Sequence, residues 1–90
     1  MKGKICLVTG GSIGIGKMIS EGFVANGAIV YICSRKKQMC EKACQELNDK
    51  YPQGKAISLP GDLSTLKGVE EVVKAFPAEK LHVLINNGRI

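Results

Sequence analysis

One segment of the chain constrains its fold more than any other: residues 9–16 read Thr-Gly-Gly-Ser-Ile-Gly-Ile-Gly. The apolar run Ile5–Val8 precedes this segment and predicts a buried parallel strand. Residues at helical spacing follow the glycines and predict an amphipathic helix: Met18, Ile19, Gly22, Phe23 and Ala25. A strand, a glycine-rich turn and a helix in this order are typical of a loop that binds nucleotide phosphate.

Glycine serves such a loop in three ways. It permits a tight turn at Gly10, a close approach of backbone to pyrophosphate, and close packing of helix on strand near Gly16. The helix N-terminus then presents free N–H groups to the phosphate. A glycine-rich turn between a strand and a helix can also be only a turn. The segment lacks the Gly-Lys-Ser/Thr ending of a P-loop, which excludes a Walker-type ATPase.

Strand and helix patterns alternate along the whole chain and predict an α/β fold. Gly27 is the expected stop of the first helix. Right-handed crossovers would give a Rossmann-type parallel sheet with strand order 3-2-1-4, and no linker divides residues 1–90. The expected strands are Lys4–Thr9, Ala28–Cys33, Ala56–Leu59 and His82–Asn86, and the expected helices are Ile15–Asn26, Lys37–Lys50 and Leu66–Phe76.

Charge and length bear on the partners of the chain. The formal net charge is +5, but the basic residues are scattered apart from the run 35–37, so we expect no nucleic acid partner. No apolar stretch approaches the roughly 20 residues that a membrane span needs. Because the first residues do not resemble a secretory signal, we expect a cytoplasmic protein with reduced thiols.

The chain has 4 cysteines. Cys6 and Cys33 fall within expected strands, where they would be packed as small hydrophobic residues. Cys40 and Cys44 share one helical face, which we expect to pack on the sheet. Two thiols could begin a metal site, but His82 is the only histidine and no second cysteine pair exists, so we expect no metal.

The spacing Thr-Gly-x-x-x-Gly-x-Gly, with the later segments Gly61-Asp62-Leu63 and Leu84-Ile85-Asn86-Asn87-Gly88, resembles the short-chain dehydrogenase/reductase family, classical type. The resemblance implies that Asp62 contacts adenine with the Leu63 backbone nearby, that Asn86 holds the central strands, and that Gly88 lies near the cofactor ribose. Asp62 could instead cap a helix, and residues 86–88 could be a plain turn. The family usually has Asn-Asn-Ala-Gly where this chain has Asn86-Asn87-Gly88-Arg89.

The residues after the second strand bear on the choice of cofactor, because an acidic side chain there binds the ribose 2′-hydroxyl of NAD and repels a 2′-phosphate. This chain has Ser34 and Arg35 instead, and an arginine can pair with phosphate through a planar, charge-assisted fork. We therefore expect NADP(H) to be preferred over NAD(H). Two observations oppose this: an arginine after a strand is often a solvated cap, and Ile13 stands where NADP-preferring relatives often carry a basic residue.

The pattern and the resemblance together give the expected cofactor-binding residues: Thr9, Gly10, Ser12, Ile13, Gly14, Ile15, Gly16, Ser34, Arg35, Asp62, Leu63, Asn86, Asn87 and Gly88. No catalytic residue is expected, because the resemblance covers only the family's N-terminal cofactor-binding half, and we expect the chain to be truncated after the fourth strand. The family's catalytic serine and Tyr-x-x-x-Lys belong to the other half. Tyr51 and Lys55 match that motif literally, but Pro52 and Gly54 break a helix between them.

We therefore expect the NADP(H)-binding portion of a short-chain oxidoreductase that transfers hydride between NADPH and a carbonyl or alcohol substrate. Two alternatives remain open: a non-catalytic nucleotide-binding remnant, or an interaction module. In the second alternative, the exposed edge of the fourth strand would allow self-association.

Overall fold

The computed structural model describes residues 2–9, 14–61, 66–75 and 83–86. Strands and helices alternate in it, which confirms the α/β class. Their bounds are β1 (Ile5–Thr9), α1 (Gly14–Ala25), β2 (Ile29–Ser34), α2 (Lys37–Lys50), β3 (Lys55–Pro60), α3 (Leu66–Ala75) and β4 (Val83–Asn86). The bounds lie within one residue of the expected ones, except that Phe76 and His82, expected at two ends, lie outside the described residues.

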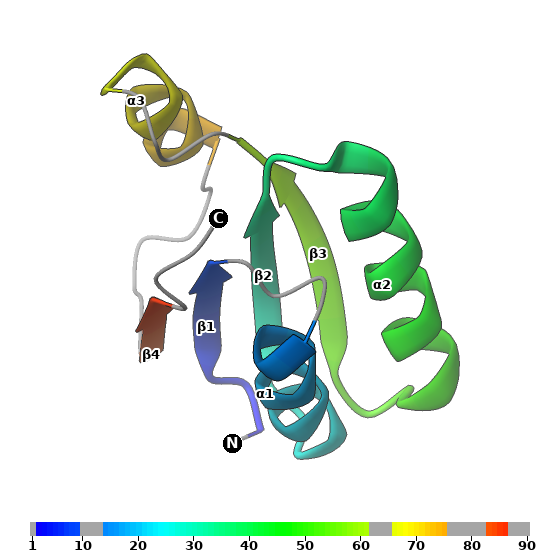
Figure 1. Cartoon of the computed structure of the whole chain (residues 1–90). Coiled ribbons are helices and arrows are strands. Elements are labelled where there is room, and N and C mark those ends of the chain that lie inside the picture. Colours follow the sequence, from blue (N-terminus) through cyan, green and yellow to red (C-terminus); the bar gives the residue numbers. More distant parts are fainter. Residues whose placement is uncertain (1, 10–13, 62–65, 76–82, 87–90) are drawn as a thin grey trace.

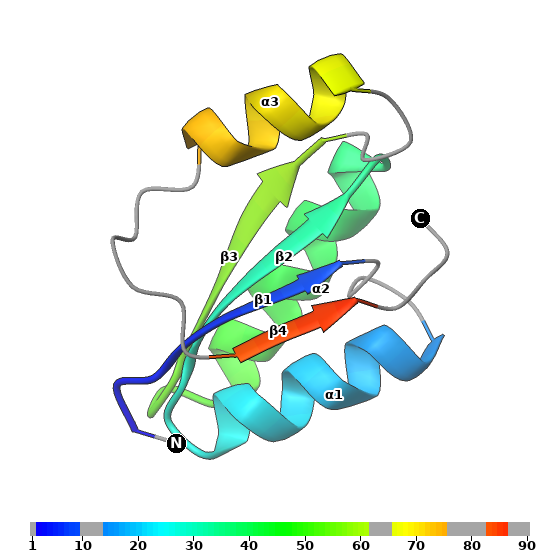
Figure 2. The same cartoon turned by 90° about the vertical axis from the view of Figure 1, so that its left-hand side faces the viewer.

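The strands form one parallel sheet in the order β3-β2-β1-β4. Ile5 pairs with Ile29 on β2, and Thr9 pairs with Asn86 on β4. Helices α1 and α2 lie beside one another against one face of the sheet (Figure 1), and α3 lies on the opposite side from α1 (Figure 2). Because every strand runs in the same direction, the carboxyl ends of all strands meet at one edge.

The main core lies between the sheet and the two helices α1 and α2. It combines strand residues such as Val8 and Ile32 with Val24 of α1 and Leu47 of α2, each 0–1% exposed. Three cysteines belong to this core, namely Cys6, Cys40 and Cys44, whereas Cys33 lies on the other face of the sheet; all four are buried and free. Each therefore acts as a small hydrophobic residue, as the strand and helix patterns predicted.

The face of α1 that packs on the sheet matches the predicted pattern only in part. Gly16, Ser20 and Val24 are buried, whereas Met18 is 72% exposed and Gly22 is also exposed. Small residues one turn apart let the helix axis approach the sheet, and the Ser20 hydroxyl donates to the Gly16 carbonyl at 2.9 Å, so its polar group is satisfied inside the helix. Phe23 packs against the core as its helical spacing indicated, but hydrophobicity did not single out Gly16 and Ser20, because these buried residues are small.

Gly27 ends α1 as predicted. Its φ of +88° is in the left-handed region that favours glycine. The Gly27 N–H donates to the Val24 carbonyl, and the Ala28 N–H donates to the Phe23 carbonyl, both at 3.0 Å. These two bonds form a Schellman motif, which satisfies the last carbonyls of the helix.

Asn48 of α2 forms hydrogen bonds with the outer strand β3. The Asn48 amide donates to the Ala56 carbonyl at 2.9 Å and accepts from the Ala56 N–H at 2.8 Å. The Asn48 side chain thus satisfies the N–H and carbonyl of Ala56, which the edge strand β3 would otherwise leave free to pair with another strand.

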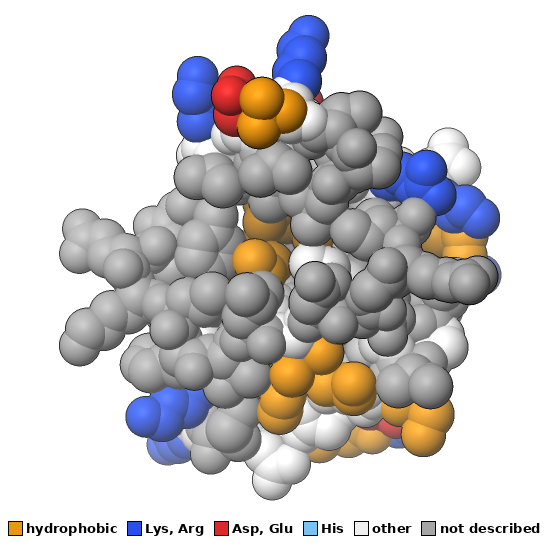
Figure 3. All heavy atoms as spheres, turned by 60° about the vertical axis from the view of Figure 1, so that its left-hand side comes forward, with side chains coloured by type: hydrophobic (Ala, Val, Ile, Leu, Met, Phe, Trp, Pro, Cys, Tyr) orange, Lys and Arg blue, Asp and Glu red, His pale blue; other side chains and the backbone are white. Residues whose placement is uncertain are grey.

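The sheet face opposite α1 and α2 carries a second apolar cluster. Tyr31, Cys33 and Leu59 are buried there, while Leu7 and Ile57 are half-buried. Figure 3 turns the β4 side of the molecule forward, and hydrophobic side chains remain visible at its surface between the grey segments. The predicted self-association through β4 stays a prediction.

Gly54 and Gly22 provide a matched pair of glycine substitutions. A Cβ at Gly54 would collide with the carbonyl oxygen of Val24 and lie 2.9 Å from that of Ala28. We expect Gly54→Ala to lower the free energy of unfolding by about 1–3 kcal/mol, because neither backbone group can yield easily. Gly22→Ala meets nothing within 4 Å and should raise it by about 0.5–1 kcal/mol. Urea denaturation measures both, and equal effects would contradict this packing.

Ionisation of Cys33 gives a pH-dependent test of the sheet. Burial, and after it the charge of Cys40, raises the pKa of Cys33 from 9.0 to about 11. As the pH rises, the Cys33 thiol ionises in the unfolded chain before it ionises in the folded chain. Its contribution to the free energy of unfolding is therefore complete below pH 9.0 and is lost as the pH rises through about 11. In urea melts between these pH values, the free energy of unfolding should fall more steeply for the native chain than for Cys33→Ala. Parallel curves would show that Cys33 ionises equally in both states.

Candidate functional site

The carboxyl edge of the sheet brings together residues that are far apart in the sequence. Thr9 ends β1, Ser34 ends β2 and Asn86 ends β4. Thr9 is the Cα partner of both Cys33 and Asn86 in the parallel register. The Thr9 hydroxyl donates to the Ile85 carbonyl at 3.4 Å, which ties the ends of β1 and β4 together. Ligands of open α/β sheets bind outside this edge, so the predicted site residues of these strands lie where a ligand would.

Helix α1 begins at this edge with Gly14. The φ of Gly14 is +59°, which an L-residue adopts only with strain, and a Cβ there would meet no atom of the described residues within 4 Å. The glycine is therefore required by its backbone conformation, and no described residue fills the space beside it. The first turn of α1 carries no acidic side chain, so nothing in that turn repels an anion from the free N–H groups.

Ser34 shapes the turn that leads from β2 into α2. Its hydroxyl accepts a hydrogen bond from the Lys36 N–H at 3.2 Å, and its carbonyl accepts one from the Gly61 N–H at 3.0 Å. Ser34 is buried, whereas Arg35 and Lys36 are exposed. The buried serine thus fixes the turn, and the turn presents two exposed cationic side chains at the same edge as Thr9.

The other predicted site residues divide into two groups. Gly16 is buried in α1, as close packing of helix on strand requires, and Ile15 belongs to the same helix. The remaining predictions lie outside the described residues: Gly10, Ser12, Ile13, Asp62, Leu63, Asn87 and Gly88. Their assignment to cofactor binding stays a prediction, as it does for the residues that the structure describes.

Tyr51 and Lys55 lie at the opposite edge of the sheet. Tyr51 follows the last turn of α2, and Lys55 begins β3, so both are at the amino end of a strand. The segment between them is not helical, and the two side chains are therefore not stacked one turn apart. This position is remote from the edge formed by Thr9 and Asn86.

The described part of the chain offers neither a metal site nor a membrane span. Within it, no group of three or more His, Cys, Asp or Glu side chains is placed to hold a metal ion. In the same residues, no helix has the length and apolar character needed to cross a bilayer.

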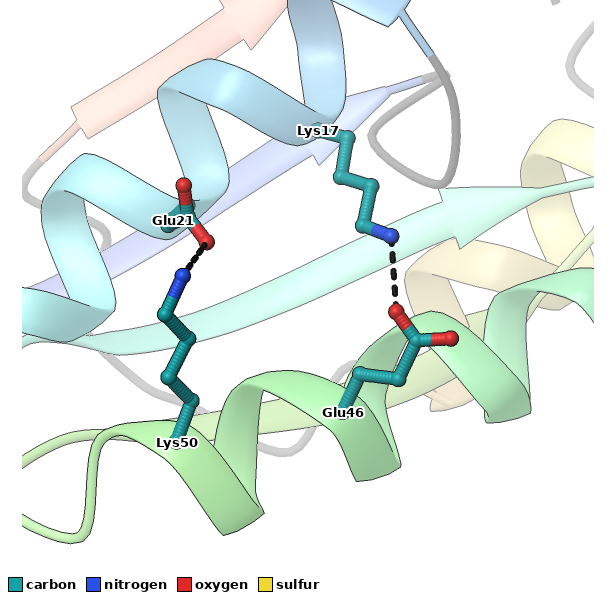
Figure 4. Close-up of polar contacts among 4 residues, drawn as sticks. All are labelled: Lys17, Glu21, Glu46 and Lys50. Atoms are coloured by element: carbon teal, nitrogen blue, oxygen red, sulfur yellow. Dashed lines mark hydrogen bonds and ion pairs between the residues drawn. The ribbon is translucent and has the colours of Figure 1, made fainter.

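Two cross-helix ion pairs at α1 were not foreseen from the sequence. Lys17 and Glu21 of α1 pair with Glu46 and Lys50 of α2, respectively (Figure 4). Opposite charges four residues apart on both helices were the available signal, but that pattern does not say which helices lie side by side.

Comparison with known proteins decides the family. The model of the short chain dehydrogenase family matches residues 4–90. The chain belongs to this family. The rhamnolipid-biosynthesis 3-oxoacyl-(acyl-carrier-protein) reductase of Pseudomonas aeruginosa is 37% identical over 89 residues. Human retinol dehydrogenase 11 is 34% identical over 92 residues.

Solved structures of short chain dehydrogenases agree with the fold described above. The RhlG/NADP active-site complex from Pseudomonas aeruginosa has a TM-score of 0.89 and 38% identity, and covers 97% of this chain. L-sorbose reductase from Gluconobacter frateurii, complexed with NADPH and L-sorbose, has a TM-score of 0.86 and 30% identity over 99% of this chain. The match covers 35% and 34% of those two chains, so this chain spans about a third of the length of its relatives.

Substitution of Gly14 tests the backbone conformation at the start of α1. We expect Gly14→Ala to lower the free energy of unfolding by about 1–2 kcal/mol, because alanine is strained at a φ of +59°. Gly14→Asn should cost less, since asparagine tolerates the left-handed region. Thermal or urea denaturation measures both. If alanine were no worse than asparagine, the left-handed conformation of Gly14 would be disproved.

Proposed function

We propose that this chain is the NADP(H)-binding portion of a short-chain oxidoreductase that transfers hydride between NADPH and a carbonyl or alcohol substrate. One observation carries the proposal. The N-terminus of α1 at Gly14 and the turn at Ser34–Lys36 occur at the same edge of the sheet. The first suits a pyrophosphate and the second suits the phosphorylated ribose of the same dinucleotide.

The chemistry of both places fits a nicotinamide dinucleotide. Among the described residues, none fills the space beside Gly14 at the helix N-terminus, and no acidic side chain in the first turn of α1 opposes an anion. Thr9 and Asn86 flank the crevice at the ends of paired strands. When bound, the cofactor would supply the hydride, while these residues bind and orient it. The proposal assigns no proton transfer to residues 1–90.

The preference for NADP(H) rests on the turn after β2. Ser34 carries no charge to repel a 2′-phosphate, and its hydroxyl is engaged by the Lys36 N–H. Arg35 is exposed beside it and can present its planar guanidinium to phosphate. Two of the similar structures, from Pseudomonas aeruginosa and Gluconobacter frateurii, are complexes with NADP and NADPH, which supports the same preference here.

The phosphate role of Arg35 is tested by nucleotide titration. We expect Arg35→Ala to weaken NADPH binding by about 10- to 100-fold, the usual range for a lost charge-assisted hydrogen bond, and to change NADH binding less than about twofold. Calorimetry or the fluorescence of the reduced nicotinamide measures both dissociation constants.

Lys42→Ala is the matched control, because Lys42 is an exposed cation on α2 outside the turn. It should leave both affinities within about twofold, the scale of an exposed charge. Equal loss of NADPH and NADH affinity in Arg35→Ala would remove the 2′-phosphate assignment. Absence of binding of either nucleotide to the native chain would overturn the proposed function.

A further inference from the structure

Two ion pairs join α1 to α2 on the surface that covers the sheet. The Lys17 Nζ lies 2.8 Å from Glu46 Oε2, and the Lys50 Nζ lies 3.4 Å from Glu21 Oε2. Figure 4 shows each side chain extending from its helix toward its partner across the gap between the two helices. We call these four side chains the charge ladder. The hydrogen bond from Lys17 holds the pKa of Glu46 below its ordinary range, as expected of a paired carboxylate.

The order of charges in the ladder favours one register of the two helices. Each helix contributes its two charges four residues apart, and their order is reversed between the helices. A slip of one turn in one direction would bring Lys17 against Lys50, and a slip in the other direction would bring Glu21 against Glu46. In the observed register both contacts are attractive. In each register one turn away, the contact that remains is repulsive.

Packing against the sheet holds the two halves of α1 unequally. In the C-terminal half, Val24 is buried in the core and Phe23 packs against that core. In the N-terminal half, which begins at Gly14, the buried residues Gly16 and Ser20 lack large side chains that could hold this half in one position. The position of α1 along its axis sets where Gly14 lies relative to the turn that holds Ser34, because that turn leads directly into α2.

We propose that the charge ladder positions the start of α1 relative to the β2–α2 turn, and thereby sets the spacing between the two phosphate-binding points of the dinucleotide site. The four side chains are positioning residues, since the ion pairs that they form join α1 to α2 and include neither Gly14 nor the Ser34–Lys36 turn. This inference rests on the proposed function. It adds a determinant of cofactor affinity that lies outside the glycine-rich segment and outside the Ser34–Lys36 turn.

The test exchanges charges without changing the net charge. The first variant combines Lys17→Glu with Glu21→Lys, which makes both contacts repulsive in the native register and favours a slipped one. The second variant adds Glu46→Lys and Lys50→Glu, which restores both attractive contacts with reversed polarity. The dissociation constant for NADPH is measured for the native chain and both variants at a temperature well below melting, with thermal denaturation recorded alongside.

We expect the first variant to bind NADPH about three- to tenfold more weakly than the native chain, as two exposed ion pairs turn repulsive. The second variant should recover native affinity within about twofold, the scale of a single exposed pair. The second variant also carries Lys17→Glu, so recovery separates register from any direct effect of charge near the phosphate.

Three results would overturn the inference. Native affinity in the first variant would show that the ladder does not matter. Weak binding that persists in the second variant would show that the Lys17 charge matters and the register does not. Failure of the native chain to bind NADPH would overturn the proposed function and this inference with it.

Discussion

Strand β1 is paired in parallel with β2 on one side and β4 on the other, and this central pairing decides where the other features of the chain can lie. Parallel neighbours require crossover helices, which cover the faces of the sheet and return each strand to the same starting edge. As a result Thr9, Ser34 and Asn86 end at one edge although they are far apart in the sequence. The glycine-rich segment leaves β1 at the same edge, so the candidate site is a consequence of the sheet.

Close approach of α1 to the sheet has effects on both stability and function. Gly16 and Ser20 form part of its buried stripe, and the Ser20 hydroxyl is satisfied by the Gly16 carbonyl. Such small contacts bury little apolar surface, so the N-terminal half of α1 is held less firmly than the C-terminal half, where Val24 is buried in the core. The surface charges on α1 and α2 then help to set the position of α1, even though each exposed pair contributes little to folding. A weak ion pair can affect ligand binding when it favours one position of a helix over others that lie close to it in space.

Polar and sulfur-containing side chains reinforce the packing of α2. Asn48 binds both backbone groups of Ala56 and so covers part of the β3 edge. Cys40 and Leu47 fill the core beneath the same helix. The Cys40 thiol donates to the Ile32 carbonyl at 3.1 Å, which gives a buried polar atom its partner. The cysteines of this helix thus serve packing, and the Ser34–Lys36 turn leads directly into the packed helix α2.

The sequence alone determined the order and type of the strands and helices, the stop at Gly27 and the place of the glycine-rich turn, because periodicity and glycine act over a few neighbouring residues. The sequence also indicated close packing near Gly16, but only the tertiary structure decided that Ser20, and not Met18, faces the sheet. The tertiary structure also decided that Asn48 binds Ala56 and that Lys17 pairs with Glu46. Such contacts depend on how close two elements lie and in which register, and the one-dimensional pattern specifies neither.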